Sequence, residues 1–532
     1  MVPCVIFEDE HLLAVNKPAG WNTHAPSPHA GEGIYDWLKN REPRWATLAI
    51  IHRLDKETSG VMVFSKTPLA NRSLTDQFTR RLVRKKYLLL TNQEAPQKEF
   101  TVRSRLLRIG DKYASRPGGE PAETRFVPIL EAGVTVNNAG LRMVDAEPLT
   151  GRTHQIRVHA AENGFPILGD RLYGGAPAAR VFLHATEIAF THPATGAPMK
   201  LSAPPDFGAD PRLALRRALI EPEATDAFRL IHGASDGWPG WYVEKLGEFL
   251  LSQSASELSP AQREELERLA PMAGARGAYH KVLSRQVRRS TVIEASPQPV
   301  WGEPAPEPLV ISENGLHFDL SFREGYSVGL FLDQRDNRRR WLTRHVAAGF
   351  PLPRLNVGGA EILNVFAYSC GFSVCAAQAG ARTTSLDLSK KYLEWGRRNF
   401  ARNGLDPAAH DFIFGDAFDW LRRLAKKGRA FEAVILDPPT FSQSREHGVF
   451  RAEKQFGELA GAALGVLKPG GVLLAATNAA GWPAESFLRI VAAAAASRQR
   501  RVKLVHYVPQ PPDFPISREE PAHFKSAWLQ LE

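Results

Sequence analysis

The sequence predicts a multidomain protein with an α+β domain, a small β-rich domain and an α/β domain on a doubly wound parallel sheet. Its 532 residues exceed what one hydrophobic core usually holds. Strand-like runs dominate roughly the first 205 residues. From Ala360 onwards strands and helices alternate instead, which is the order that builds a parallel sheet.

The first domain is expected to consist mainly of antiparallel strands. Residues 3–24 are predicted as one strand entering a Pro-Gly loop. Further strands are predicted within 48–66 and over 86–91, 123–130, 141–147 and 180–190. Helices are predicted over 34–40, 68–84 and 153–163, the last capped by Thr153.

Proline-rich stretches divide the chain further. Residues 206–225 look like a linker with a short helix, and 296–308 form a proline-rich bridge. Strand–turn–strand patterns follow the linker, and a hairpin leads into a helix that begins near Phe331. The predicted boundaries are 1–207 and 226–298 for the first two domains, 208–225 for the linker, 305–345 for the hairpin and helix, and 346–532 for the α/β domain.

Composition favours a cytoplasmic protein with a polyanionic partner. No run of about 18 apolar residues exists, and residues 1–11 lack the features of a signal peptide. Three cysteines give neither a disulfide framework nor a metal-ligand spacing, and Cys370 and Cys375 are expected to fill buried space. The net charge is +10. Arginine and lysine cluster at 80–86, 285–289 and 335–340, which favours contacts with an RNA backbone.

One stretch of the first domain, IHRLDKETSG (residues 51–60), places Asp55 among cations ahead of an apolar run. Nearby positive charge favours the ionised carboxylate, and an ionised acid at the mouth of a strand can act as a nucleophile. Taken alone, the spacing favours a surface ion pair beside a turn over a catalytic acid.

Several segments together resemble the RluA-type pseudouridine synthases: EDEHLLAVNKPAGWNTH, HRLD with TSG, RRLVRKKYLLL, LTGRTHQIRVH and PILGDRLYGG. The resemblance implies that Asp55 is the nucleophile, that Arg157 pairs with it, and that Tyr87 packs on the uracil. It also implies that Arg53, Arg152 and Lys85 contact RNA. The target uridine would leave the base stack, and this reaction needs no cofactor.

In the third domain, residues that follow parallel strands should lie along one edge of the sheet. These are residues 368–371, Asp387, Asp416 and Asp437. Asp387 could bind a ribose and Asp416 an adenine, although strand-end acids equally well cap the next helix. The Ser-Cys-Gly turn is no GxGxxG motif, so a dinucleotide fits poorly.

Residues 226–532 resemble class I S-adenosylmethionine-dependent methyltransferases of the ribosomal large-subunit I and K/L type. The resemblance rests on RLIHGASDGWPGWYVEKLG, GLFLDQRDNRR, LNVFAYSCGFSVCAAQAGA, LDLSKKYLEWGRRNFARNGL, GDAFDWL and LDPPTFSQS. It implies a PUA-like, RNA-binding middle domain. It implies S-adenosylmethionine as cofactor, bound by Asp333, Arg335, Phe366, Tyr368, Gly371, Asp387, Asp416 and Asp437. Pro438, Pro439 and Phe441 would line the target-base pocket.

The methylated atom is predicted from the missing cysteines. Carbon-5 of cytosine needs a covalent helper, usually a cysteine, but neither DPPTFSQS nor the segment 471–482 contains one. Guanine N7 is already nucleophilic and needs only positioning. We therefore expect a bifunctional enzyme that makes pseudouridine and 7-methylguanine, in 23S rRNA or a precursor particle, and does not act on DNA or membranes. The alternatives are 5-methylcytosine formation, a tRNA substrate for the first half, and an RNA-binding assembly factor with one inactive site.

Overall fold

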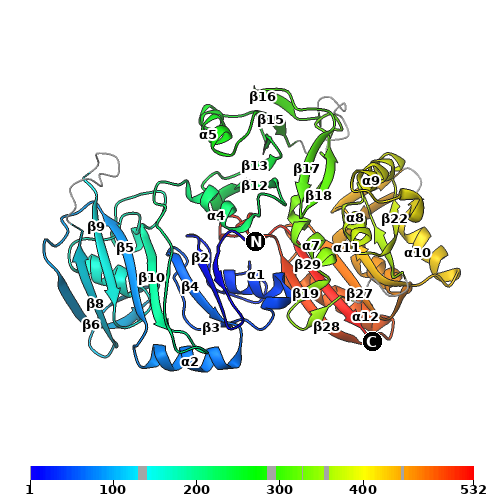
Figure 1. Cartoon of the computed structure of the whole chain (residues 1–532). Helices are drawn as coiled ribbons and strands as arrows, with labels where there is room; N and C mark the ends of the chain where they lie inside the picture. Colours follow the sequence, from blue (N-terminus) through cyan, green and yellow to red (C-terminus); the bar gives the residue numbers. More distant parts are fainter. Residues whose placement is uncertain (1, 130–139, 284–294, 326, 353–358, 445–447) are drawn as a thin grey trace. The chain divides into compact units, whose positions relative to one another are not determined.

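The computed structural model describes residues 2–129, 140–283, 295–325, 327–352, 359–444 and 448–532. The chain forms two compact units, of which the first comprises residues 1–25, 33–38 and 47–221 and the second comprises 26–32, 39–46 and 222–532. In Figure 1 the colours follow the sequence, so most of the first unit is blue to cyan and residues 222–532 of the second are green to red. The predicted RNA-contacting cluster at Arg285, Arg288 and Arg289 lies outside the described residues.

The first unit is built on an 11-stranded sheet with the order β1-β2-β4-β10-β5-β9-β8-β6-β7, in which β11 adds to β10 and β3 to β4. Its strands are β1 Val5–Glu8, β2 Leu12–Lys17, β3 Ala49–Ile50, β4 Ser59–Ser65, β5 Arg84–Thr91, β6 Phe100–Ile109, β7 Lys112–Ser115, β8 Glu120–Pro128, β9 Arg142–Pro148, β10 Leu183–Thr191 and β11 Pro198–Ser202.

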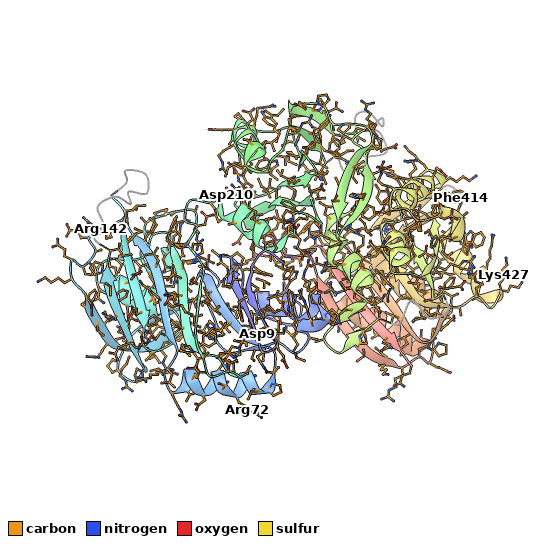
Figure 2. All side chains as sticks on the ribbon, in the orientation of Figure 1. Asp9, Arg72, Arg142, Asp210, Phe414 and Lys427 are labelled. Carbon is orange, nitrogen blue, oxygen red and sulfur yellow. The ribbon has the colours of Figure 1, made fainter. Side chains whose placement is uncertain are left out.

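The prediction of one strand over residues 3–24 is wrong, because β1 and β2 form an antiparallel hairpin. Asp9 lies in the turn between them (Figure 2). One oxygen of its carboxylate accepts hydrogen bonds from the backbone amides of His11 and Leu12, each at 2.7 Å. An aspartate that bonds to backbone two or three residues ahead favours a turn, so Asp9 divides this run into two strands.

Strand β4 fixes the chain next to Asp55. All seven of its residues are buried, and it pairs with β2 on one side and in parallel with β10 on the other. Gly60 adopts a φ of +118°, and a Cβ there would lie 2.2 Å from the carbonyl oxygen of Ala185. Only glycine fits such a close approach of two strands, so β10 holds the start of β4 rigidly.

The helices of the first unit are α2 Pro68–Thr79, α3 Gln155–Glu162, α4 Pro211–Leu219 and the larger part of α1 Ile34–Arg41. The expected cap at Thr153 is wrong: His154 holds the N-cap position of α3 in a left-handed conformation without a side-chain cap. The short helix expected in the linker is α4. Its Leu213 and Leu219 are buried, so this segment packs as part of a folded unit.

The second unit begins with a five-stranded sheet of order β12-β13-β14-β15-β16. These strands are β12 Ala227–His232, β13 Trp241–Leu246, β14 Phe249–Ser254, β15 Gly277–Val282 and β16 Gln298–Gly302, with α5 Pro260–Met272 between β14 and β15. The predicted hairpin follows as β17 Leu309–Glu313 and β18 Leu316–Leu320. A short 3-10 helix, η5 Leu332–Gln334, then leads into α7 Arg335–Thr343, and β19 His345–Ala347 pairs with β20 Phe350–Pro351.

The doubly wound sheet is confirmed, with the order β23-β22-β21-β24-β27-β29-β28. The first five strands run parallel to one another, and β29 runs antiparallel to both of its neighbours, β27 and β28. The strands are β21 Glu361–Val365, β22 Arg382–Asp387, β23 Asp411–Phe414, β24 Phe431–Leu436, β27 Leu467–Thr477, β28 Val502–Pro509 and β29 Lys525–Leu531. The helices are α8 Gly371–Gln378, α9 Lys390–Arg402, α10 Ala417–Lys426, α11 Ala452–Leu464 and α12 Ala484–Ser497.

Two expectations about buried side chains have different outcomes. Cys370 and Cys375 are buried free thiols, as predicted. The arginine cluster at 335–340, in contrast, was expected to contact RNA, but Arg335, Arg338 and Arg340 are buried. Arg338, for example, forms a bidentate pair with buried Glu313 at 2.6 and 2.8 Å. The RNA-contact prediction is wrong for these three residues, because most of α7 is buried.

Within the described ranges, no helix combines the length and apolarity needed to cross a membrane.

Candidate active sites

The Asp55 loop is clamped on both sides of the carboxylate. The hydroxyl of Thr23 donates to the carbonyl oxygen of Leu54 at 2.8 Å and accepts from the Leu54 amide at 3.2 Å. On the other side, the buried Lys17 ammonium donates to the carbonyl oxygen of Lys56 at 3.1 Å. Burial lowers the pKa of Lys17 to about 7. Asp55 therefore sits on a fixed loop, not on a mobile surface turn.

Arg157 faces Asp55 from α3, with 3.8 Å between its Nη1 and the Asp55 Oδ2. Its main partner is buried Asp170, which accepts from Nε and Nη2 at 2.7 Å each. Burial alone would lower the pKa of Arg157, but Asp170 and Asp55 raise it above its usual value. Asp170 was not predicted as a site residue. It lies in the PILGDRLYGG segment, but nothing in that spacing ties it to Arg157.

Tyr87 on β5 also belongs to this site. Burial and the negative charge of Asp55 together raise the pKa of Tyr87 well above its usual range, so its phenol is neutral. Nearby, the ring of Tyr173 lies 5.1 Å from the Arg157 guanidinium carbon, and its hydroxyl is 2.8 Å from Nδ1 of His154. The structure thus brings the three predicted catalytic residues together.

The predicted RNA contacts differ in exposure. Arg53 is exposed beside Asp55. Arg152 pairs with Glu120 and donates to the carbonyl oxygen of Pro121 at 3.1 Å. Lys85 donates to the carbonyl oxygen of Thr150 at 3.3 Å, and burial lowers its pKa to about 8. Because neighbouring side chains along a strand point to opposite faces, Lys86 lies on the other face of β5, where it pairs with Asp145.

The Arg157–Asp170 pair yields a stability prediction. Asp170→Ala leaves a buried guanidinium without its bidentate partner, so we expect the first unit to lose about 3–5 kcal/mol of unfolding free energy. Urea unfolding followed by circular dichroism measures this. The control is Asp145→Ala, which removes the more exposed pair with Lys86 and should cost less than about 1 kcal/mol. Equal losses in the two variants would refute the structural role of Asp170.

The second site lies at the carboxyl ends of the parallel strands. After β21, three non-glycine residues adopt left-handed conformations: Phe366, Tyr368 and Cys370, with φ of 63°, 50° and 63°. Alternating left-handed residues turn backbone N–H groups toward one side, which suits a bound ligand. Gly371 begins α8, where a Cβ would come within 2.9 Å of the Leu330 side chain. It therefore allows close packing.

Two strand-end acids shape this loop and its neighbour. Asp387 accepts hydrogen bonds from the amides of Tyr368 and Ser389, both at 2.8 Å, and its burial raises its pKa. Asp416 caps α10 by accepting from the amides of Phe418 and Asp419 at 2.9 and 3.1 Å. Each carboxylate has lone pairs beyond these bonds, so capping does not prevent contact with a ligand.

Asp437, which directly follows β24, lies among charged and polar groups. Burial raises its pKa to about 7, and the charge of Asp333 adds to this, while Gln334 and Arg338 oppose it. Asp333 itself lies 3.4 Å from Nε2 of His523. The buried side chain of Gln334 accepts a hydrogen bond from Nδ2 of Asn337 at 2.8 Å, so this site combines carboxylates with an oriented amide.

Arg335 was expected to contact the cofactor, but its side chain pairs with another residue of the protein. Its guanidinium is buried in a bidentate pair with Asp513, at 2.9 and 2.5 Å. Pro438 is buried, whereas Pro439 and Phe441 are exposed. Thr440, between them, donates its hydroxyl to Oδ1 of Asn478 at 2.5 Å, which ties the end of β24 to the end of β27.

Comparisons with known proteins find relatives for both halves of the chain. The family model described as RNA pseudouridylate synthase matches residues 11–162, and that of the S-adenosylmethionine-dependent methyltransferases matches 229–529. A ribosomal RNA large subunit methyltransferase of Deinococcus radiodurans is 34% identical over 61% of this chain and 78% of its own length. A ribosomal RNA large subunit methyltransferase I of Aeromonas salmonicida is 31% identical over 58% of this chain and 75% of its own.

Among solved structures, human RNA pseudouridylate synthase domain-containing protein 4 aligns at 25% identity with a TM-score of 0.31. The alignment covers 40% of this chain and 92% of the human protein.

The chain belongs to the S-adenosylmethionine-dependent methyltransferase family and also carries an RluA-type pseudouridine synthase domain. It is therefore a bifunctional RNA-modifying enzyme that uses S-adenosylmethionine in its second half and no cofactor in its first. The two predicted family resemblances are confirmed.

Proposed function

We propose that this enzyme converts a uridine to pseudouridine at Asp55 and methylates N7 of a guanine beside Asp437, both in 23S rRNA or a precursor particle. The main support is that the two acids lie in different compact units, each with its own set of polar partners. The relatives named above are ribosomal RNA large subunit methyltransferases, which supports the choice of RNA.

In the first half, Asp55 is the nucleophile that allows the N1–C1′ bond of the flipped uridine to break and the uracil to rejoin through C5. Arg157 holds the Asp55 carboxylate and is itself oriented by Asp170. The neutral phenol of Tyr87 packs on the uracil and takes part in removal of the C5 proton. Arg53, Arg152 and Lys85 hold the RNA backbone around the flipped nucleotide.

In the second half, the donor set fits S-adenosylmethionine, which supplies an electrophilic methyl group when bound. Asp387 would hold the ribose, Asp416 the adenine edge, and Asp333 the methionine ammonium group. Phe366, Tyr368 and Gly371 would form the loop around the cofactor. We assign Arg335 a positioning role, because its pair with Asp513 fixes the start of α7 next to Asp333.

Methylation at N7 is supported by the state of the cysteine in the cofactor loop. Burial raises the pKa of the Cys370 thiol to about 12, so it cannot supply the thiolate that carbon-5 methylation of cytosine requires. Guanine N7 needs no covalent helper. Methyl transfer places positive charge on the base, and the Asp437 carboxylate would stabilise that charge. Pro438 and Pro439 would border the base, with Phe441 at the outer edge of this pocket.

This assignment is tested by nucleoside mass spectrometry of 23S rRNA and tRNA from a strain that lacks the gene. We expect one pseudouridine and one 7-methylguanosine to disappear from 23S rRNA and to return with the gene. Loss of 5-methylcytidine instead, or losses confined to tRNA, would contradict the proposal. We further propose that the β12–β16 sheet is a PUA-like RNA-binding domain and that the enzyme works in the cytoplasm.

The pKa of Asp437 gives a pH prediction. Because burial raises this pKa to about 7, the carboxylate forms as the pH rises through about 7 and is lost below it. Single-turnover methyl transfer should therefore rise between pH 6 and 8 and then level off. Asp437→Asn should be slow and nearly independent of pH over this interval. A wild-type rate that stays flat from pH 6 to 8 would exclude ionised Asp437 from the reaction.

A further inference from the structure

The antiparallel hairpin after Asp437-Pro438-Pro439 consists of β25 Phe441–Ser444 and β26 Gly448–Arg451. Phe441 lies opposite Arg451, and Ser442 lies opposite Phe450. Residues opposite one another in an antiparallel pair point to the same face, and neighbours along a strand point to opposite faces. Phe441, Val449 and Arg451 therefore share one face of the hairpin, and Phe450 lies on the other.

The Phe450 face packs against the methyltransferase domain. The Phe450 ring lies 5.8 Å from that of Phe366 and 6.3 Å from that of Phe418, next to a buried hydrophobic cluster. The base of the hairpin is closed by a hydrogen bond at 3.1 Å from the Ala452 amide to the carbonyl oxygen of Thr440. The packing of Phe450 therefore fixes the hairpin beside the cofactor loop, with Phe441, Val449 and Arg451 on its outward face.

The outward face combines apolar surface with positive charge. Phe441 is 48% exposed and Val449 45% exposed. The guanidinium carbon of exposed Arg451 lies 5.9 Å from the Phe441 ring centroid. A nucleotide matches this pattern, because its base offers a flat π-face for an aromatic ring and its phosphate attracts a cation.

We propose that this outward face stacks the unpaired nucleotide next to the methylated base. The inference rests on the proposed function, since it needs the target base to lie at Asp437. Phe441 follows Asp437 by four residues, so their Cα atoms are at most about 14 Å apart. When a base is turned out of its stack, its neighbour loses a stacking partner. Phe441, Val449 and Arg451 replace that partner.

Photo-crosslinking tests the stacking directly on the full-length chain. The probe is a single-stranded RNA dodecamer that carries 5-iodouridine, whose irradiation links it to aromatic rings in contact with it. We expect mass spectrometry to find a crosslink to Phe441. Phe441→Leu should lower its yield at least about 10-fold, and Phe441→Trp should restore a crosslink at position 441. The matched control Val505→Ala, at a 54% exposed apolar residue of β28, should leave the yield unchanged.

A crosslink absent from position 441, or unchanged methyl-transfer KM for RNA in Phe441→Leu, would overturn the inference. So would a change in oligomeric state of Phe441→Leu, since it would show that a second copy of the chain covers this face. Failure of the proposed function has a different signature: wild-type enzyme would transfer no methyl group to rRNA although the crosslink at Phe441 forms.

Discussion

Asp55→Asn is expected to abolish pseudouridine formation while methyl transfer continues at the wild-type rate. An amide is no nucleophile, so the rate of isomerisation should fall at least about 1000-fold. The fold should survive, because Asp55 is 28% exposed at its side chain and Arg157 keeps its bidentate partner Asp170. Tritium release from C5-tritiated uridine in RNA measures the isomerisation.

The matched control for Asp55 is Glu57→Gln, which removes the other acid of the same loop. It changes the local charge by the same amount but leaves the proposed nucleophile in place, so isomerisation should continue within a few-fold of wild type. Wild-type isomerisation by Asp55→Asn would remove Asp55 from the mechanism. Equal loss in both variants would show that the reaction depends on the charge of the loop and not on Asp55 itself.

Asp437→Ala is expected to have the reverse effect. It removes the carboxylate that would stabilise the positive charge developing on the methylated base, so methyl transfer should slow by about 100-fold or more. Pseudouridine formation should be unaffected, because Asp55 and its partners lie in the other compact unit. Transfer of tritiated methyl groups from S-adenosylmethionine to rRNA measures the loss.

Calorimetric titration with S-adenosylmethionine separates two explanations for such a loss. If Asp437 acts on the base, Asp437→Ala should bind the cofactor within a few-fold of wild type and show its defect in the rate. Asp406→Asn, at an acid that caps a short helix away from the strand ends, serves as the control for both assays. Wild-type methylation by Asp437→Ala would remove Asp437 from the mechanism.

The parts of the fold that depend on local patterns could be predicted from the sequence. The alternation of strands and helices from Ala360 onwards predicted the parallel sheet. Of the strand-end acids, Asp387 is the last residue of β22, Asp437 directly follows β24, and Asp416 lies just after β23. Motifs likewise identified Asp55, Tyr87 and Arg157, which come together from three separate elements.

Features set by distant partners could not be predicted. The burial of Arg335 and Arg338 depends on Asp513 and Glu313, which are far away in the sequence. The role of Asp170 depends in the same way on the approach of α3. A run of charged residues has the same sequence pattern whether its side chains are exposed to solvent or paired inside a core, because burial is a property of the tertiary structure.

The central claim is that one chain carries two independent RNA-modifying sites. The most direct measurement is nucleoside mass spectrometry of 23S rRNA from a deletion strain that expresses wild-type enzyme, Asp55→Asn or Asp437→Ala. The account predicts that Asp55→Asn restores only 7-methylguanosine and that Asp437→Ala restores only pseudouridine. Loss of both modifications in either variant, with the protein folded and present at wild-type level, would contradict it.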